Sequence, residues 1–487
     1  MKAGGIALLI RHLVAIASAP ALLLGALSAN AASVGSSLAD ALRAADADDK
    51  IEIIIELHAQ ADAAAAAASV PSGDRNAHSA AVIGALQSTA SSAQAGLRTY
   101  LAGQEASGTV ADVTPFWIFN GISVRSTKAV VSAIASRPEI ASVTLDETIT
   151  LPPVTPGTGG AAIAAPEWGI NKVGAPIVWN FLGTKGEGSV VGILDTGLDP
   201  DHPDLLPCPV AWFDAVNGNP DPYDDNNHGS HVTGTSVGGN AGGSDIGVAP
   251  GARYISCKAF DQNGSGSSTN ILRCMQWFTD PDGNPGTADY PDVVNNSWSS
   301  GPNCSTTFTN SVRAWWALGI FPDFAAGGFG PGVGSAASPG QNPESFGVGA
   351  TDINDVIASF SGRGPSSCDG SIFPEVSAPG VNIRSSISPG WLRELQRYLH
   401  GDPARRWLRR PDPKCGRSRR QVRPAANAVG SVRSHAICER SRSGGPRQRL
   451  RRGSNQLRAV GLRSMSRIKA LFRKPVEYAQ VIRQSST

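Results

Sequence analysis

The sequence predicts an α/β protein with a twisted, mostly parallel sheet covered by helices on both faces, preceded by a small α+β unit. Short apolar segments alternate with helical stretches over residues 188–350, which is the order typical of a parallel sheet. Glycine and proline number 55 and 34 among 487 residues, which favours a loop-rich architecture over a helical bundle. In such sheets, functional side chains collect at the carboxyl ends of the strands.

Residues 1–31 have the pattern of a secretory signal. Lys2, Arg11 and His12 precede a short apolar stretch, and the small-x-small site Ala29–Ala31 follows it. A retained membrane anchor is the alternative, but the stretch suits cleavage better. We therefore expect a secreted, extracellular protein without a membrane span after cleavage. In that compartment disulfides are permitted, although the pairing of the seven cysteines cannot be deduced from their spacing.

Residues 32–152 are expected to form the α+β unit, in the order strand, helix, strand, helix, strand. The expected elements are a strand at Ile51–Leu57, a helix within His78–Leu101, an apolar strand at Phe116–Val124, a helix capped by Ser126, and a strand at Val143–Leu145. Residues 151–160 hold three prolines and three glycines, which is typical of a linker that a protease can cut.

Residues 153–390 are expected to contain the parallel sheet. The expected strands are Gly188–Leu194, Tyr254–Phe260, Val293–Asn295, Ile320–Ala326 and Phe346–Ala350, and the expected helices include Asn270–Phe278 and Thr309–Leu318.

A carboxylate, Asp195, directly follows the first of these strands, and Gly197 allows a sharp turn after it. A buried carboxylate at this place can orient a histidine and stabilise its imidazolium form. The tripeptide Asp-Thr-Gly also occurs in aspartic proteases, but these would carry a second copy in a related half. The sequence has no second copy.

Two histidines follow in Asn-His-Gly-Ser-His-Val-Thr-Gly-Thr, residues 227–235. A histidine at a helix start, followed by small residues, can face a strand terminus while the helix packs closely behind it. The alternative is a metal pair of His228 and His231, with a further ligand from Asp221, Asp224 or Asp225.

Together the two motifs resemble the subtilase family, in which the acid precedes the histidine along the chain. The resemblance covers about residues 168–390, and the motif sequences are most similar to those of the bacillopeptidase F group. It extends through the segments at residues 247–252, 295–298, 324–327, 348–351, 361–366 and 376–381.

The resemblance implies the three-layer subtilase fold and a serine endopeptidase that acts on polypeptides. It implies that Asp195 orients the base, that His228 is the general base, and that Ser297, Trp298 and Ser299 line the substrate groove. It also implies that residues 32–152 are a propeptide that inhibits the enzyme intramolecularly. No cofactor is needed for this chemistry; calcium is common in the family, but its ligands cannot be assigned from the sequence.

The sequence departs from the family pattern at Gly328. Subtilases read Ala-Ala-Gly-Asn where this chain has Ala-Ala-Gly-Gly, and the asparagine donates a hydrogen bond to the oxyanion. Loss of one such donor costs about 2.7–4 kcal/mol of transition-state stabilisation.

A larger departure follows Gly390, where the family continues with Gly-Thr-Ser-Met-Ala-x-Pro-His and its nucleophilic serine. Residues 391–407 lack this motif. However, permissible codons for Trp391–Trp407, beginning TGG CTA CGG GAG CTA CAG CGG TAC CTC CAT, encode Gly-Tyr-Gly-Ser-Tyr-Ser-Gly-Thr-Ser-Met-Ala-Thr-Pro-His-Val-Ala when read one nucleotide later. The serine then falls across the codons of Leu399 and His400. We hypothesise a frameshift near Gly390.

The charge distribution supports two joined reading frames. Residues 391–487 hold 25 basic and 5 acidic side chains, whereas residues 1–390 hold 17 basic and 35 acidic ones. An arginine-rich arm for nucleic acid or anionic membrane is the competing explanation. The export signal and the alternate-frame motif argue against it, so we expect no nucleic-acid partner.

Two further alternatives keep the chain functional without the missing serine. One is a pseudoprotease that binds peptides near Trp298 without cleaving them. The other is an enzyme with a different nucleophile, for which Ser361 and Ser366 are the nominal residues, although neither lies in a nucleophile-bearing context.

Overall fold

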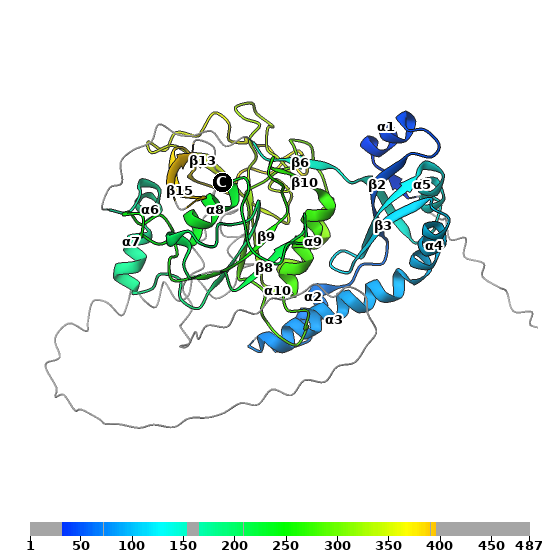
Figure 1. Ribbon diagram of the computed structural model, residues 1–487, viewed down its shortest axis with the longest axis horizontal. Helices are drawn as coiled ribbons and strands as arrows, with labels where there is room; N and C mark the ends of the chain where they lie inside the picture. The colour runs from blue at the N-terminus through cyan, green and yellow to red at the C-terminus, as the bar shows by residue number, and fades with distance from the viewer. Residues whose placement is uncertain (1–31, 72, 153–164, 208, 390, 396–487) are drawn as a thin grey trace, which may run out of the picture. The chain divides into compact units, whose positions relative to one another are not determined.

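The computed structural model describes residues 32–71, 73–152, 165–207, 209–389 and 391–395 (Figure 1). The expected signal, most of the expected linker and nearly all of the basic tail lie outside these residues. The chain divides into residues 1–426 and 427–487, and all described residues belong to the first unit. Within the described ranges, no helix is long and apolar enough to cross a membrane.

Residues 32–150 contain a five-stranded sheet with strand order β1-β5-β2-β4-β3. The elements are β1 (Ser33–Val34), α1 (Ser36–Ala44), β2 (Lys50–Leu57), α2 (Ala63–Ala68), α3 (Arg75–Ala93), α4 (Ala95–Ala106), β3 (Val110–Phe116), β4 (Gly121–Thr127), α5 (Lys128–Ala135), β5 (Ile140–Leu145) and β6 (Thr148–Thr150). The strand β6 lies outside this sheet and pairs with a strand of the second part of the chain.

This sheet is apolar on both faces, as the alternation along β2 shows. Ile53 and Ile55 pack with side chains of α4 and α5, whereas Ile54 belongs to a cluster shared with the rest of the chain. Successive side chains of a strand point to opposite faces, so one face closes the small core and the other is available for docking.

Three details of the N-terminal prediction need correction. The segment expected as one strand, Phe116–Val124, is the end of β3, a turn and β4, because Asn120 takes a positive φ of 45° that reverses the chain. The expected single helix is two helices that meet at Gln94. The cap of α5 is Thr127 without a side-chain bond, and Ser126 lies in β4.

The second part of the chain contains a seven-stranded parallel sheet with the order β14-β13-β12-β11-β7-β9-β8. Its elements are α6 (Trp168–Lys172), α7 (Ala175–Ile177), the π-helical turn η1 (Val178–Leu182), β7 (Val190–Asp195), the 3₁₀ turn η2 (Pro203–Leu205), β8 (Ala211–Asp214), α8 (His228–Val237), β9 (Arg253–Lys258), β10 (Ser265–Ser267), α9 (Ser268–Thr279), β11 (Val293–Asn296), α10 (Thr309–Leu318), β12 (Phe321–Ala325), β13 (Phe346–Thr351), β14 (Val376–Pro379), β15 (Ile383–Ile387) and β16 (Trp391–Leu395). The last two pair as an antiparallel hairpin.

Helices cover both faces of the parallel sheet, which confirms the predicted three-layer α/β fold. Ile193 of β7 packs with Val232 of α8, whereas the next residue, Leu194, packs with α9 and α10. Central strands of parallel sheets are buried on both faces, which explains the uninterrupted apolar run of β7.

Capping residues explain where α9 begins and where α10 ends. Ser267 caps α9 by accepting a hydrogen bond from Asn270 N. Gly319 ends α10 in the left-handed conformation, with φ of 82°, which glycine adopts without strain. The bounds of α10 agree with those predicted from the sequence.

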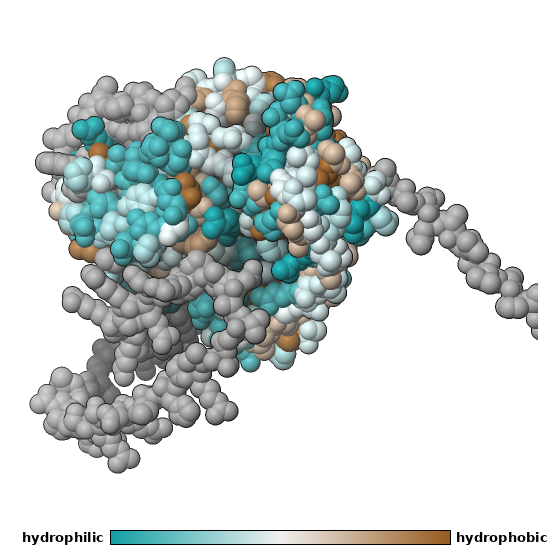
Figure 2. Space-filling view, turned by 45° about the vertical axis from the view of Figure 1, so that its right-hand side comes forward, coloured by the Kyte–Doolittle hydropathy of each residue, from teal (hydrophilic) through white to brown (hydrophobic). Residues whose placement is uncertain are grey.

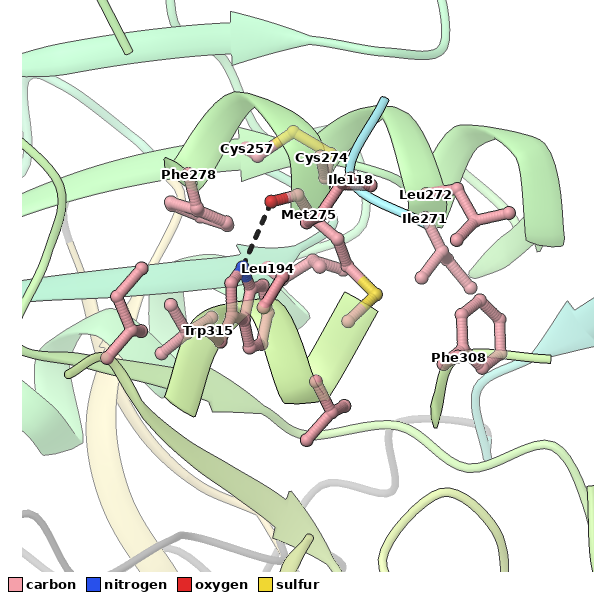
Figure 3. Close-up of a cluster of buried hydrophobic side chains, with 14 of the residues drawn as sticks. Ile118, Leu194, Cys257, Ile271, Leu272, Cys274, Met275, Phe278, Phe308 and Trp315 are labelled. Carbon is pink, nitrogen blue, oxygen red and sulfur yellow. Dashed lines mark hydrogen bonds between the residues drawn. A yellow bond between two sulfur atoms is a disulfide. The ribbon is translucent and has the colours of Figure 1, made fainter. Parts of the chain in front are cut away.

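The apolar cluster between the sheet and these helices includes residues of the N-terminal part. In Figure 3, Ile118 lies among Leu194, Met275 and neighbouring side chains, and Trp315 Nε1 donates to Met275 O at 3.0 Å. The disulfide Cys257–Cys274 joins β9 to α9 beside this cluster, and a second disulfide joins Cys304 to Cys368. On the face seen in Figure 2, hydrophobic residues form separate patches among hydrophilic ones, an ordinary surface pattern.

Gly234 lies where α8 packs against β15, so a side chain at this position tests the packing. A Cβ at this position would overlap Ser386 Oγ and lie 3.0 Å from Ser386 N, so Gly234→Ala should destabilise the fold by about 1–3 kcal/mol. The matched control is Gly84→Ala in α3, where a Cβ meets nothing within 4 Å and alanine should stabilise the helix by about 0.5–1 kcal/mol. Urea unfolding of both variants measures the difference, and equal stability of the two would contradict this packing.

Candidate active site

Asp195 is the last residue of β7, a strand in the interior of the parallel sheet. Its side chain is fully buried, and Oδ1 accepts a hydrogen bond from Thr196 N at 2.7 Å. The residue therefore lies at the carboxyl end of its strand, the edge where the sequence predicted functional side chains.

His228 is the first residue of α8, and only 4% of its surface is exposed. Its Nδ1 lies 2.6 Å from Asp195 Oδ1. Because a carboxylate only accepts hydrogen bonds, Nδ1 carries the proton and donates it. Such a bond fixes both the rotation and the tautomer of the imidazole.

Thr196 and Asp224 hold the start of α8 against the end of β7. Thr196 Oγ1 donates to Asp224 Oδ1 at 2.9 Å and accepts from Gly229 N at 2.8 Å. Asp224 Oδ2 accepts from Ser230 N at 2.8 Å and from Ser230 Oγ at 2.7 Å. An acidic side chain that binds the first-turn amides stabilises a helix start, so Asp224 fixes the position from which His228 projects.

Two glycines permit the close approach of these segments. Gly197 has a φ of 118°, and a Cβ on it would overlap Tyr223 O. A Cβ on Gly229 would overlap Gly197 O. The glycines of Asp-Thr-Gly and His-Gly-Ser-His are therefore required by the contact between the two motifs.

A buried cation also lies at this edge of the sheet. Lys258, the last residue of β9, is fully buried, and its Nζ lies 2.6 Å from both Thr196 O and Asp225 Oδ1. No sequence pattern singled out Lys258, since one lysine at a strand end is usually exposed.

His231 does not share a site with His228. Its ring is fully buried, and Nε2 lies 2.9 Å from Ile383 O, which ties α8 to β15. Burial, more than the nearby His228, lowers the pKa of His231 to about 3. With Asp224 bound to helix amides and Asp225 paired with Lys258, the contacts do not support the metal-pair alternative.

The predicted groove residues follow β11 directly. Ser297 and Trp298 are buried, while Ser299 is partly exposed. The Trp298 ring packs against Phe308 and Phe324, with centroids 5.2 and 5.6 Å apart, in the core beneath this edge. The Trp298 side chain therefore supports the surface at the end of β11 from below.

Gly328 lies after the end of β12, three residues beyond Ala325. It is partly exposed, and a Cβ there would meet nothing within 4 Å. The position thus has room for a side chain that the sequence does not supply.

Ser361 and Ser366 have structural roles that disfavour them as nucleophiles. Ser361 is fully buried, and its Oγ accepts from Ala350 N at 3.0 Å. Ser366 is 3% exposed, and its Oγ donates to Gln341 O at 2.9 Å.

Comparison with known proteins gives a family match over the same region. The Subtilase family profile matches residues 186–408. Bacillopeptidase F of Bacillus subtilis (strain 168) is 41% identical over 339 residues, which are 64% of this chain and 23% of that protein. Serine protease AprX of the same organism is 36% identical over 239 residues, or 45% of this chain and 53% of AprX.

A shorter relative is covered more fully. Subtilisin Savinase of Lederbergia lenta is 37% identical over 223 residues, which are 46% of this chain and 74% of Savinase. By contrast, the chain spans under a quarter of bacillopeptidase F and about half of AprX.

The buried His231 predicts a specific pH dependence. The pKa of His231 is about 3 in the folded protein, against the ordinary histidine value of 6.5, so between these values the unfolded chain binds a proton that the folded chain does not. The free energy of unfolding should therefore fall as the pH drops from 6.5 towards 3. In His231→Asn this contribution is absent. The free energy of unfolding, measured with urea at pH 7.5, 6 and 5, should therefore fall less steeply with falling pH than in the native sequence. An equal pH dependence of the two proteins would contradict this assignment.

Proposed function

The chain belongs to the subtilase family of serine proteases, and we propose that it holds the acid and the base of an endopeptidase site whose nucleophilic serine is missing from this translation. The observation that carries the proposal is the 2.6 Å contact between His228 Nδ1 and Asp195 Oδ1 at the end of a central strand. The proposed substrates are polypeptides.

In an intact site, the pair acts through the second nitrogen of the imidazole. With Nδ1 donating to Asp195, Nε2 of His228 takes the proton of the serine as that serine attacks the peptide carbonyl. Asp195 stabilises the resulting imidazolium by its negative charge, and the imidazolium returns the proton to the leaving amine. The acyl-enzyme is then hydrolysed by water through the same base.

The proposed break at Gly390 falls within the hairpin, between β15 and β16. The strands pair from Ile383–Leu395 to Ile387–Trp391 through main-chain groups, and such pairing tolerates an altered sequence. The Oγ atoms of Ser385 and Ser386 donate to the carbonyls of His231 and Ser230 on α8. In the alternate frame, the nucleophile motif would follow this hairpin; residues 396–407 themselves lie outside the described part.

The N-terminal unit is proposed to act as an intramolecular inhibitor. Its last strand, β6, pairs antiparallel with β10, and Leu151 N donates to Gly264 O at 2.8 Å. Gln276 Oε1 on α9 accepts from Trp117 N at 2.7 Å. An extended segment held along an edge strand is how many proteins bind peptides, so β6 would exclude a substrate from β10.

We also propose that the protein is exported as a zymogen. Two disulfides, Cys257–Cys274 and Cys304–Cys368, suit an oxidising compartment. The alternative function is that of a peptide-binding pseudoprotease. The β6–β10 pairing supports it too, since strand pairing of this kind needs no serine.

Deleting one nucleotide directly after the codon of Gly390 should restore an active enzyme. We expect the restored protein to react with a fluorophosphonate and to hydrolyse casein, and the chain as written to do neither, because only the restored frame supplies a serine near His228. His228→Ala in the restored protein is the control and should abolish labelling. Labelling of the chain as written would overturn the proposal, and tight peptide binding without labelling by the restored protein would favour the pseudoprotease.

Gly328→Asn should increase the activity of the restored protein. The asparagine would supply a hydrogen-bond donor to the oxyanion, and such donors change kcat by about 10²–10³-fold. Because the position is open, stability should change little, and Gly328→Ala is the matched control. The measurement is kcat with a chromogenic peptide. Equal kcat for the asparagine and alanine variants would show that residue 328 does not face the oxyanion.

A further inference from the structure

Lys258 takes no part in the proton transfers of the proposed mechanism, yet it lies at the same edge of the sheet as the acid and the base. Among the lysines and arginines of the described ranges, only Lys258 is buried, and its side chain has no exposed surface. Removing an ammonium group from water is costly, so a buried one persists only where several partners compensate. The partners of Lys258 therefore indicate what its burial achieves.

The ammonium group joins two segments of the active edge. Its Nζ donates to Thr196 O at 2.6 Å, forms an ion pair with Asp225 Oδ1 at 2.6 Å, and lies 4.8 Å from the centroid of the Tyr223 ring. Thr196 directly follows the acid, and Asp225 lies three residues before the base. One cation thus links the segment that carries the acid to the segment that carries the base.

On the acid side, Lys258 fixes a peptide group that a glycine leaves free to rotate. Thr196 O belongs to the peptide that joins Thr196 to Gly197, which has a φ of 118°. Glycine has access to a wide range of φ, so steric contacts alone do not hold this peptide in one orientation. Thr196 N donates to Asp195 Oδ1 at 2.7 Å, and Ala259 N donates to Asp195 O at 2.8 Å. With Thr196 O also held, the backbone donor to the acid has a fixed position.

On the base side, the segment before α8 contains a residue in an uncommon conformation. Asn227, next to His228, has a φ of 81°, in the left-handed region that residues other than glycine rarely adopt. Such a conformation persists where surrounding contacts impose it. Asp224 Oδ1 supplies one contact by accepting from Asn227 N at 2.9 Å. The ion pair of Lys258 and Asp225 restrains the neighbouring residue of the same segment.

We propose that Lys258 is a positioning residue for the acid–base pair, which keeps Asp195 and His228 at hydrogen-bonding distance. It acts through the Thr196 carbonyl and Asp225 and does not itself take part in the reaction. Without the ammonium group, the buried Thr196 carbonyl would lose its donor and Asp225 its partner. The importance of Lys258 for catalysis rests on the proposed function, whereas its effect on the hydrogen bond between the acid and the base does not.

The Nδ1 proton of His228 reports on this position in the chain as written. A proton in a short hydrogen bond to a carboxylate resonates far downfield in NMR spectra and exchanges slowly with water, and His228→Ala identifies the resonance by its loss. We expect Lys258→Met to move this resonance upfield and to speed its exchange with water by about tenfold or more, because hydrogen bonds to charged groups are among the stronger ones. An unchanged resonance with unchanged exchange in Lys258→Met would overturn the proposal.

Two controls separate positioning from general loss of stability. Lys172→Met removes another paired lysine, whose Nζ lies 2.7 Å from Asp355 Oδ2, and Leu318→Ala truncates a buried side chain at the end of α10. Both variants should retain the downfield resonance, although urea unfolding should show Leu318→Ala to be less stable. An equal upfield shift in Leu318→Ala would show that destabilisation alone moves the resonance, which would also overturn the proposal.

Asp225→Ala tests the same link if Lys258→Met does not fold. The Asp225 side chain is 32% exposed, so its removal leaves the fold better able to form than the loss of the buried ammonium does. We expect an upfield shift of the His228 resonance in this variant too, because Lys258 then loses its contact with the segment before α8. A resonance identical to that of the native sequence would contradict the link.

The restored reading frame adds a kinetic readout. In the restored protein, Lys258→Met should lower kcat by about 10–100-fold and change KM little, because a small misplacement of catalytic groups slows the chemical step while the substrate groove stays intact. An unchanged kcat would overturn the positioning role. A restored protein that is inactive with Lys258 in place would contradict the proposed function, and the NMR comparison would still decide the role of Lys258.

Discussion

The hydrogen bond between Asp195 and His228 is the constraint on which the rest of this edge of the sheet depends. It joins the end of a buried strand to the first residue of a helix, and both side chains are almost completely removed from water. Asp195 Oδ1 accepts hydrogen bonds from both His228 Nδ1 and Thr196 N, whereas its buried Oδ2 has no partner among the described residues. The neighbouring contacts keep these two side chains at hydrogen-bonding distance.

Contacts from several elements maintain the relative position of Asp195 and His228. Asp224 and Thr196 tie the start of α8 to the end of β7, while Gly197 and Gly229 allow the two backbones to touch. Behind α8, Gly234 lets the helix lie against β15. A positioning bond of 2.6 Å is therefore supported by the strand, the helix and the hairpin together. This arrangement is present in the chain as written, on the N-terminal side of the proposed frame break.

Much of this could be predicted from the sequence, and the failures have physical causes. The central strands β7 and β11 begin with β-branched apolar residues, and a glycine follows the apolar positions of α10, so these three elements were predicted well. The turn at Asn120 was missed because apolar residues flank it on both sides, and the break at Gln94 was missed because buried polar contacts, including Gln94 Nε2 to Phe116 O, are tertiary. Asp195 and His228 were found because they follow recognisable segments. Lys258 was not found, and Asp224 was considered only as a metal ligand, because their roles depend on partners that only the fold brings together.

The central claim is that the acid and base survive in a chain whose nucleophile was lost by a shift of frame near Gly390. Sequencing the gene across the codons of Gly390–Trp407 tests it most directly. We predict a string that, read one nucleotide later, encodes Gly-Thr-Ser-Met-Ala-Thr-Pro-His after the hairpin. Codons that cannot encode this motif in any shifted frame would contradict the account and make residues 391–487 a genuine part of the protein.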